Sequence, residues 1–306
     1  MKVKRLAPSK MEARPSWVPA TATTVVGGLP VPATWALILG IIQGLTEFLP
    51  VSSSGHLVIA QGLFGVKPPG IAVEVAAHAG TLGAILAVYG RDAVRIAAGF
   101  LEGITGGAAR RGREFRLALL IVLASVPAAA AGLLWKDAFE GAFESTIVAG
   151  FGLVATGIIL LLASGTRMVG LGNPHPGDMS AGRALFVGVA QAVAIVPGIS
   201  RSGFTISAGV AAGLGREDAA MFSFLLAIPA VAGATLLGLR DIASGGLPAG
   251  VSAGSLVIVA LSAMVSGIAA LRFFIGTLKR GGLRPFAFYC FAAGAAALLT
   301  TLIGGR

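Results

Sequence analysis

Charged residues are scarce in this sequence: they make up 12% of its 306 positions, whereas 56% of the positions are hydrophobic. A soluble domain carries about 25% charged residues, so the composition excludes a soluble enzyme or binding domain. The mean hydropathy of +0.88 indicates an integral membrane protein. The net charge of +10 comes from short runs between long apolar segments. Because no basic stripe with interleaved aromatic residues occurs, no nucleic acid partner is expected.

Cysteine and histidine are nearly absent too. The single cysteine, Cys290, excludes an intrachain disulfide and a cysteine-based metal site, and its apolar surroundings predict a side chain that faces lipid or packs. Of the three histidines, His175 lies in a loop with prolines and a glycine and is expected to be solvated. His56 and His78 are therefore the histidines available for chemistry.

Two polar stretches interrupt the apolar sequence. Residues 43–56 read QGLTEFLPVSSSGH and residues 191–204 read QAVAIVPGISRSGF, and the two align without a gap. The matched pairs are Gly40 with Gly188, Gln43 with Gln191, Ser52 with Ser200, Ser53 with Arg201, Ser54 with Ser202, Gly55 with Gly203 and Gly65 with Gly213. The alignment predicts an internal duplication with these two loops as its paired centres.

The apolar pieces on either side of each polar stretch are shorter than the roughly 20 residues that cross a bilayer. We therefore expect two re-entrant helical hairpins, over residues 34–65 and 184–214. Irregular backbone at membrane depth is stable only where protein or cavity water satisfies it, so each loop should line a polar pocket. Full spans are expected at 71–90, 116–135, 145–164, 219–239, 252–273 and 285–303.

The predicted fold is an all-α polytopic membrane protein with about six full transmembrane helices plus two re-entrant hairpins. Three spans between the hairpins would invert the second copy, so that both loops meet near the midplane of an inverted-topology repeat. The expected division is a disordered N-terminal extension at 1–33, a first repeat at 34–164, a cytoplasmic linker at 165–183 and a second repeat at 184–303.

Lys and Arg collect in the cytoplasmic loops of membrane proteins. The loop expected after the first full span holds Arg91, Arg95, Arg110, Arg111, Arg113 and Arg116, and the loop before the last span is flanked by Arg272, Lys279, Arg280 and Arg284. Both loops are therefore placed in the cytoplasm, and the polar pocket should open to the opposite, periplasmic side. The basic N-terminal tail conflicts with this orientation, and an extra span within residues 18–40 would reconcile the two.

Glu47 lies in an apolar helical segment with no cation near it in sequence. An ionised carboxylate there costs at least about 2.5–3.5 kcal/mol at the bilayer centre, which predicts that Glu47 is functional. Gln43 lies one helical turn earlier on the same face, where it either binds substrate or packs as a polar residue.

Three serines and a glycine begin the helix that follows Pro50: Ser52, Ser53, Ser54 and Gly55. Free N–H groups, hydroxyls and a glycine at a helix start suit phosphate, although one serine could serve only as a helix cap. His56 follows directly and can carry a proton at neutral pH, so it either moves protons or is hydrogen-bonded structure.

Arg201 matches Ser53 and lies at predicted membrane depth, where only an anionic partner offsets its burial. Its planar fork suits bidentate phosphate binding, and the alternative is a structural ion pair with Glu47. The residues expected to bind substrate beside it are Ser200, Ser202, Gly203 and Thr205. Glu74 and His78 share one helix face, either as a pair that orients the site or as metal ligands. The pair is favoured, because a metal needs more ligands than this face provides.

These motifs closely resemble those of the undecaprenyl-diphosphate phosphatase family, also called the bacitracin-resistance family, over residues 34–303. The resemblance implies an enzyme of the bacterial cytoplasmic (inner) membrane that removes the terminal phosphate of undecaprenyl diphosphate, recycles this lipid for cell-wall synthesis and confers bacitracin resistance. Gln43 holds the first position of the family's acidic motif, which leaves Glu47 as its carboxylate. Lipid phosphatases that resemble acid phosphatases need a histidine where Ser207 stands, so that assignment is rejected.

The expected mechanism holds the diphosphate between Arg201, the serine hydroxyls and two helix N-termini. Ser53, or alternatively a water, attacks the terminal phosphorus, and Glu47 and His56 move protons. A divalent cation, Mg²⁺ or Ca²⁺, could bridge Glu47 to the diphosphate. The competing hypothesis is a polyprenyl-phosphate transporter or flippase, because inverted repeats with broken helices occur in transporters. A homodimer is left open in either case.

Overall fold

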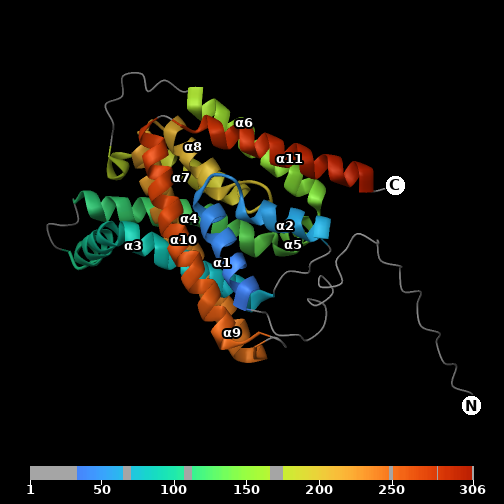
Figure 1. Cartoon of the computed structure of the whole chain (residues 1–306). Coiled ribbons are helices and arrows are strands. Elements are labelled where there is room, and N and C mark those ends of the chain that lie inside the picture. Colours follow the sequence, from blue (N-terminus) through green and yellow to red (C-terminus); the bar gives the residue numbers. More distant parts are fainter. Residues whose placement is uncertain are drawn as a thin grey trace, which may run out of the picture.

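The computed structural model describes residues 33–64, 70–106, 112–165, 175–247, 251–280 and 282–304, whose course is drawn in Figure 1. These residues are helical apart from turns and short connections. The helices are α1 (Ala33–Phe48), α2 (Ser53–Phe64), α3 (Ile71–Ile104), α4 (Arg113–Leu134), α5 (Lys136–Phe143), α6 (Thr146–Gly165), the 3-10 turn η3 (Pro176–Asp178), α7 (Ala181–Val193), α8 (Arg201–Ala211), α9 (Arg216–Gly245), α10 (Ala253–Lys279) and α11 (Arg284–Gly304). The expected all-α class is confirmed.

Six helices in the described parts of the chain are long and apolar enough to cross a membrane: α3, α4, α6, α9, α10 and α11. The polytopic membrane fold with six full spans is therefore confirmed. Helices α1 and α7 are apolar as well, but their 16 and 13 residues are fewer than the roughly 20 that span a bilayer. Each is followed by a second short helix, as the hairpins require.

The re-entrant course of these hairpins and the division into two inverted repeats stay predictions. Residues 1–32 of the predicted extension and residues 166–174 of the predicted linker lie outside the described residues. The bounds of α1 with α2, and of α7 with α8, agree with hairpins over 34–65 and 184–214 to within a few residues at each end.

Two predicted loops proved wrong in part. Arg91 and Arg95 lie inside α3 rather than after it, because α3 continues for 34 residues, roughly 50 Å at 1.5 Å per residue. That length exceeds the hydrocarbon core of about 30 Å, so the last turns of α3 can carry charges without ending the helix. The ion pair between Arg95 and Asp92 stabilises these turns. The connection between the expected spans at 116–135 and 145–164 contains the helix α5, where Lys136 pairs with Glu140 at 3.6 Å.

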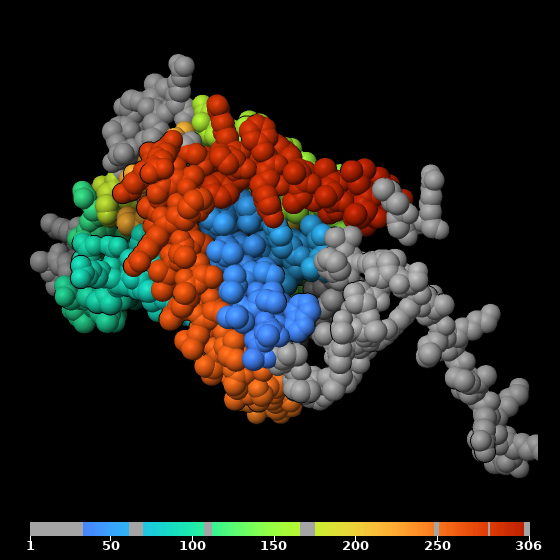
Figure 2. All heavy atoms as spheres, in the orientation of Figure 1, coloured from blue at the N-terminus to red at the C-terminus, as the bar shows by residue number. Residues whose placement is uncertain are grey.

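Helix α1 lies beside α10, and α10 also packs on α3 (Figure 1). Two glycines permit this approach, because a Cβ on Gly40 would overlap Ser262 Oγ and one on Gly44 would overlap Ala263 O. Small residues at helix contacts are typical of membrane proteins, where close backbone approach replaces hydrophobic burial. Figure 2 shows α1 at the surface between α10 and α2.

A cluster of buried phenylalanines fixes the C-terminal end of α1. Phe48 meets Phe224 of α9 edge to face with ring centroids 5.8 Å apart, and Phe224 meets Phe274 of α10 in the same way at 6.3 Å. Such edge-to-face pairs are a favoured aromatic geometry. Since Phe48 directly follows Glu47, this cluster sets the position of the carboxylate.

Candidate active site

The two polar loops contact one another in the interior. The α1–α2 loop approaches the α7–α8 loop so closely that a Cβ on Gly55 would lie 2.8 Å from Gly198 Cα. Ser202 Oγ donates to the Leu49 carbonyl at 3.4 Å across the same contact. Gly198 has a φ of +87°, in the left-handed region that favours glycine. The prediction that the two loops meet is therefore confirmed.

Glu47 is the centre of the contact. Its Oε1 accepts from Arg201 Nη2 at 2.8 Å, and its Oε2 accepts from Ser53 Oγ at 2.9 Å and from Gln43 Nε2 at 3.0 Å. The side chain of Glu47 is 9% exposed and that of Arg201 is 19% exposed. A buried ion pair with hydrogen bonds to the remaining lone pairs compensates the desolvation of both charges. The Ser53 proton points at a carboxylate that can accept it.

The first serine of each loop caps the helix that follows. Ser52 Oγ accepts from Gly55 N at 3.1 Å and Ser200 Oγ accepts from Gly203 N at 3.2 Å, as N-cap residues do. Both serines are almost fully buried and also share a hydrogen bond with the serine two residues later, Ser54 or Ser202. The simple capping role therefore applies to the first serine of each loop, and substrate binding by these residues stays a prediction.

Thr205 is engaged within the protein. Its Oγ1 donates to the Arg201 carbonyl at 2.7 Å and lies 2.5 Å from Ser223 Oγ of α9. These bonds join α8 to α9 one helical turn after Arg201. The contact of Thr205 with substrate, predicted from its place in the loop, stays a prediction.

A cavity of about 520 Å³ opens beside the Glu47 network. Its polar lining includes the expected site residues Gln43, Ser53, Ser54, Glu74 and His78. Apolar side chains from four helices complete the wall, namely Leu39, Leu57, Val73, Ala77 and Phe143. One cavity thus brings three of the predicted first-loop residues, Gln43, Ser53 and Ser54, together with the pair on α3. Its mixed lining suits a molecule with a polar head and an apolar chain.

Helix α5 contributes residues to this cavity that the sequence did not predict. Glu140 and Phe143 of α5 and the next residue, Glu144, line it, although no helix was predicted between the expected spans at 116–135 and 145–164. The available signal was the alternation of apolar and charged residues in KDAFEGAF after the exposed Trp135, a pattern typical of a short amphipathic helix at a membrane surface.

No set of three or more His, Cys, Asp or Glu side chains that could hold a metal occurs in the described parts of the chain. A divalent cation would therefore need oxygen atoms of a substrate beside the Glu47 carboxylate. One guanidinium nitrogen, Arg201 Nη1, is buried and has no partner among the described residues. Buried donors are rarely left unpaired, so this atom is available to an anion.

His56 lies apart from the Glu47 network. Its Nδ1 is 2.7 Å from the Ser52 carbonyl oxygen, and its Nε2 is 2.6 Å from Tyr289 Oη of α11. The two rings are stacked with centroids 5.6 Å apart and an angle of 9°. Both ring nitrogens are thus occupied away from Ser53, so the proton transfer expected of His56 stays a prediction. Tyr289 was missed because nothing in its apolar segment marks it.

Comparison with known proteins agrees with this site. The family described as Bacitracin resistance protein BacA matches residues 36–296, which include both polar loops. A protein of Rubrobacter xylanophilus named undecaprenyl-diphosphatase is 44% identical over 270 residues, covering 88% of this chain and 97% of that protein. A protein of Methanosphaera stadtmanae with the same name is 38% identical over 277 residues, covering 88% and 98%. The chain belongs to the bacitracin resistance protein BacA family.

Proposed function

We propose that this chain is an undecaprenyl-diphosphatase, a membrane hydrolase that converts undecaprenyl diphosphate to undecaprenyl phosphate and phosphate, recycles the cell-wall carrier lipid and confers bacitracin resistance. The observation that carries the proposal is the Glu47 carboxylate, contacted by Ser53 Oγ at 2.9 Å and by Arg201 Nη2 at 2.8 Å. A base that contacts a hydroxyl on one side and a guanidinium on the other provides the groups that phosphoryl transfer uses. The names of relatives that are 44% and 38% identical support the same function.

In the first step Ser53 Oγ bonds to the terminal phosphorus, while the bond from that phosphorus to the bridging oxygen breaks. Glu47 Oε2, which already accepts the hydroxyl hydrogen bond, takes the proton, and undecaprenyl phosphate leaves. A water then attacks the phosphorus of the phosphoserine, and the bond from phosphorus to Ser53 Oγ breaks. Glu47 returns its proton to Oγ, and both protons of the water leave with the released phosphate as H2PO4−. Direct attack by a water that Glu47 deprotonates is the alternative route, and the Ser53 variant below separates the two.

Arg201 neutralises the charge that develops on the transferred group. Its Nη2 stays on Glu47 Oε1, while the buried Nη1 is free to donate to a phosphate oxygen. A donor held in place before the reaction stabilises the transition state without reorganisation. The guanidinium therefore links the base and the diphosphate in one plane.

A divalent cation fits this site only together with substrate. Glu47 and the diphosphate are both negative, so Mg²⁺ or Ca²⁺ shared between them would remove their repulsion and polarise the phosphate. Glu47 and, on the cavity wall, Glu74 are the carboxylates that would hold it. Activity of the purified protein should therefore fall in the presence of a chelator and return when Mg²⁺ or Ca²⁺ is added.

The apolar part of the cavity supports a lipid substrate. Leu39, Leu57 and Val73 line it beside Ser53, so an isoprenoid chain could lie against them while its head group meets the serine. We place the protein in the bacterial cytoplasmic membrane with this cavity open to the periplasmic side. The placement rests on the six apolar helices and on the arginines at the far end of α3.

The test is phosphate release from undecaprenyl diphosphate by the purified protein in detergent. Ser53→Ala should release phosphate at less than about a tenth of the wild-type rate, since it lacks the nucleophile. Ser244→Ala is the matched control, because Ser244 is exposed and its hydroxyl only bonds back within α9. A wild-type protein that releases no phosphate would favour the flippase, and substantial activity of Ser53→Ala would replace serine attack with water attack.

A further inference from the structure

Ser52 has an unusual backbone conformation directly before the proposed nucleophile. Its φ is +65°, and it is the only non-glycine residue with positive φ in the described parts of the chain. Non-glycine residues enter this left-handed region rarely, and they persist there only when the surrounding structure holds them. Ser52 is also 3% exposed, so the groups that hold it must be protein groups.

The second polar loop provides an internal comparison. Ser200 matches Ser52, caps its helix with the same pair of bonds, and yet has an ordinary φ of −75°. The carbonyls of both serines accept the backbone N–H four residues later, at 3.2 Å from His56 and at 2.9 Å from Phe204. One difference that bears on this carbonyl is the side chain at that position: His56 adds a ring nitrogen 2.7 Å from the Ser52 carbonyl, which Phe204 cannot do.

Helix α11 fixes the His56 ring from the other side. A carbonyl oxygen can only accept, so Nδ1 carries a hydrogen and donates it to the Ser52 carbonyl, while Nε2 lies 2.6 Å from the Tyr289 hydroxyl oxygen. The next residue of α11, Cys290, donates its S–H to the Pro50 carbonyl at 3.4 Å. Two adjacent residues of α11 thus hold the loop before and after Ser52.

We propose that His56 and Tyr289 form a positioning pair that keeps Ser52 in its left-handed conformation and thereby places Ser53 Oγ on Glu47. The pair acts through the backbone and does not touch the reacting atoms. His56 is then a donor to a carbonyl rather than a proton carrier in the reaction. This proposal rests on the proposed function of Ser53.

The first test compares two replacements of His56 in the purified full-length protein. His56→Phe copies Phe204, keeps an aromatic ring and removes both hydrogen bonds. It should lower kcat for undecaprenyl diphosphate at least about tenfold with KM within about twofold. His56→Asn restores a donor near the place of Nδ1 and should bring kcat back to within about threefold of wild type, although Asn cannot carry a proton at neutral pH.

The second test removes one oxygen from α11. Tyr289→Phe keeps the stacked ring and deletes only the hydroxyl that holds His56, so kcat should fall about threefold to tenfold, in keeping with the loss of one hydrogen bond. Tyr89→Phe is the matched control, because Tyr89 is the other tyrosine of the chain and packs on Phe224 away from the loop. Tyr89→Phe should remain at the wild-type rate.

The outcomes separate the possible failures. A wild-type protein without phosphate release removes the proposed function itself. Where the wild type is active, a folded His56→Asn as inactive as His56→Phe assigns proton transfer to His56 and overturns the positioning role. Wild-type kcat for Tyr289→Phe removes Tyr289 from the pair. If His56→Phe does not yield folded protein by size exclusion, Tyr289→Phe and His56→Asn alone decide between positioning and proton transfer by His56.

Discussion

Three groups bind the buried carboxylate of Glu47, and each does something different. Arg201 balances its charge, Gln43 orients Oε2 from the preceding helical turn, and Ser53 presents the hydroxyl. Because Arg201 comes from α8 and Glu47 from α1, the ion pair also joins the two loops. Removing either partner would leave the other charge buried and uncompensated, which is far more costly than removing an exposed ion pair.

The geometry of Arg201 leads to a prediction for Arg201→Lys. Lysine keeps the positive charge but cannot hold Glu47 with one nitrogen and a phosphate oxygen with another in one plane. The rate of phosphate release should therefore fall at least about tenfold, which corresponds to roughly 1.4 kcal/mol of transition-state stabilisation. The measurement is kcat/KM for undecaprenyl diphosphate, with the amount of folded protein matched.

Arg183→Lys is the control for this variant, since Arg183 is exposed near the start of α7. It should remain at the wild-type rate. If Arg201→Lys also kept the wild-type rate, a point charge would suffice and the planar clamp would be wrong.

Individual residues could be predicted where a polar group stands alone in apolar sequence. Glu47 and Arg201 each lack a charged neighbour in their helical segments, so each needed a partner from elsewhere, and the structure pairs them. Tyr289 carries no such signal, and its contact with His56 joins residues far apart in sequence. Gln191 shows that the two repeats are not chemically equivalent. It matches Gln43, but the residue that matches Glu47 is Ile195. The side-chain amide of Gln191 has no partner among the described residues.

At the scale of helices, apolar length predicted six spans, because roughly 20 apolar residues are needed to cross hydrocarbon. The ends were predicted less well, since α3 and α9 run on through charged residues to 34 and 30 residues. Charges end a hydrophobic segment but do not end a helix that continues into water. Helix α5 was missed for the converse reason, because eight residues with charges are too few to give a span signal.

The contact of α1 with α10 allows a stability prediction at Gly44. A Cβ there would overlap Ser266 Oγ and Ala263 O and would lie 2.8 Å from Gly267 N. Gly44→Ala should therefore force the helices apart and destabilise the protein by about 1–3 kcal/mol, as overpacking does. Activity should fall as well, because Gly44 lies between Gln43 and Glu47. Thermal unfolding in detergent and phosphate release measure the two effects.

Gly90→Ala is the matched control in α3. No atom lies within 4 Å of a Cβ at this position, and alanine is the better helix former, so the variant should be as stable as wild type or more stable by about 0.4–1 kcal/mol. Equal unfolding temperatures for Gly44→Ala and wild type would show that α1 does not depend on this close approach.

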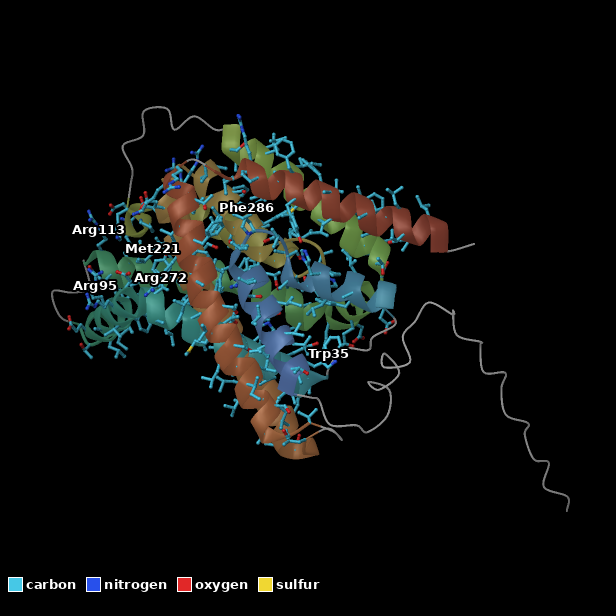
Figure 3. All side chains as sticks on the ribbon, viewed as in Figure 1. Trp35, Arg95, Arg113, Met221, Arg272 and Phe286 are labelled. Atoms are coloured by element: carbon cyan, nitrogen blue, oxygen red, sulfur yellow. The ribbon has the colours of Figure 1, made fainter. Side chains whose placement is uncertain are left out.

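In the whole molecule, the cavity and the arginines lie at opposite ends of α3. Glu74 lines the cavity near the start of the helix, and Arg95 follows at a rise of roughly 30 Å, about one hydrocarbon thickness. Figure 3 shows Arg95, Arg113 and Arg272 gathered on one side of the molecule, away from Trp35. These three basic residues, predicted for one side of the membrane, thus lie together, although all three are in helices rather than in loops.

This arrangement predicts the sidedness of the protein in intact cells. Because Lys and Arg favour the cytoplasm, Ala98 in the basic part of α3 should face inward, and Ala138 in α5, beside the cavity, should face outward. Both alanines are exposed, so Ala98→Cys and Ala138→Cys are a matched pair. An impermeant maleimide should label Ala138→Cys in intact cells and Ala98→Cys only after permeabilisation, while the buried Cys290 leaves the parent protein unlabelled. The reverse pattern would turn the cavity to the cytoplasm, and the diphosphate would then have to enter from that side.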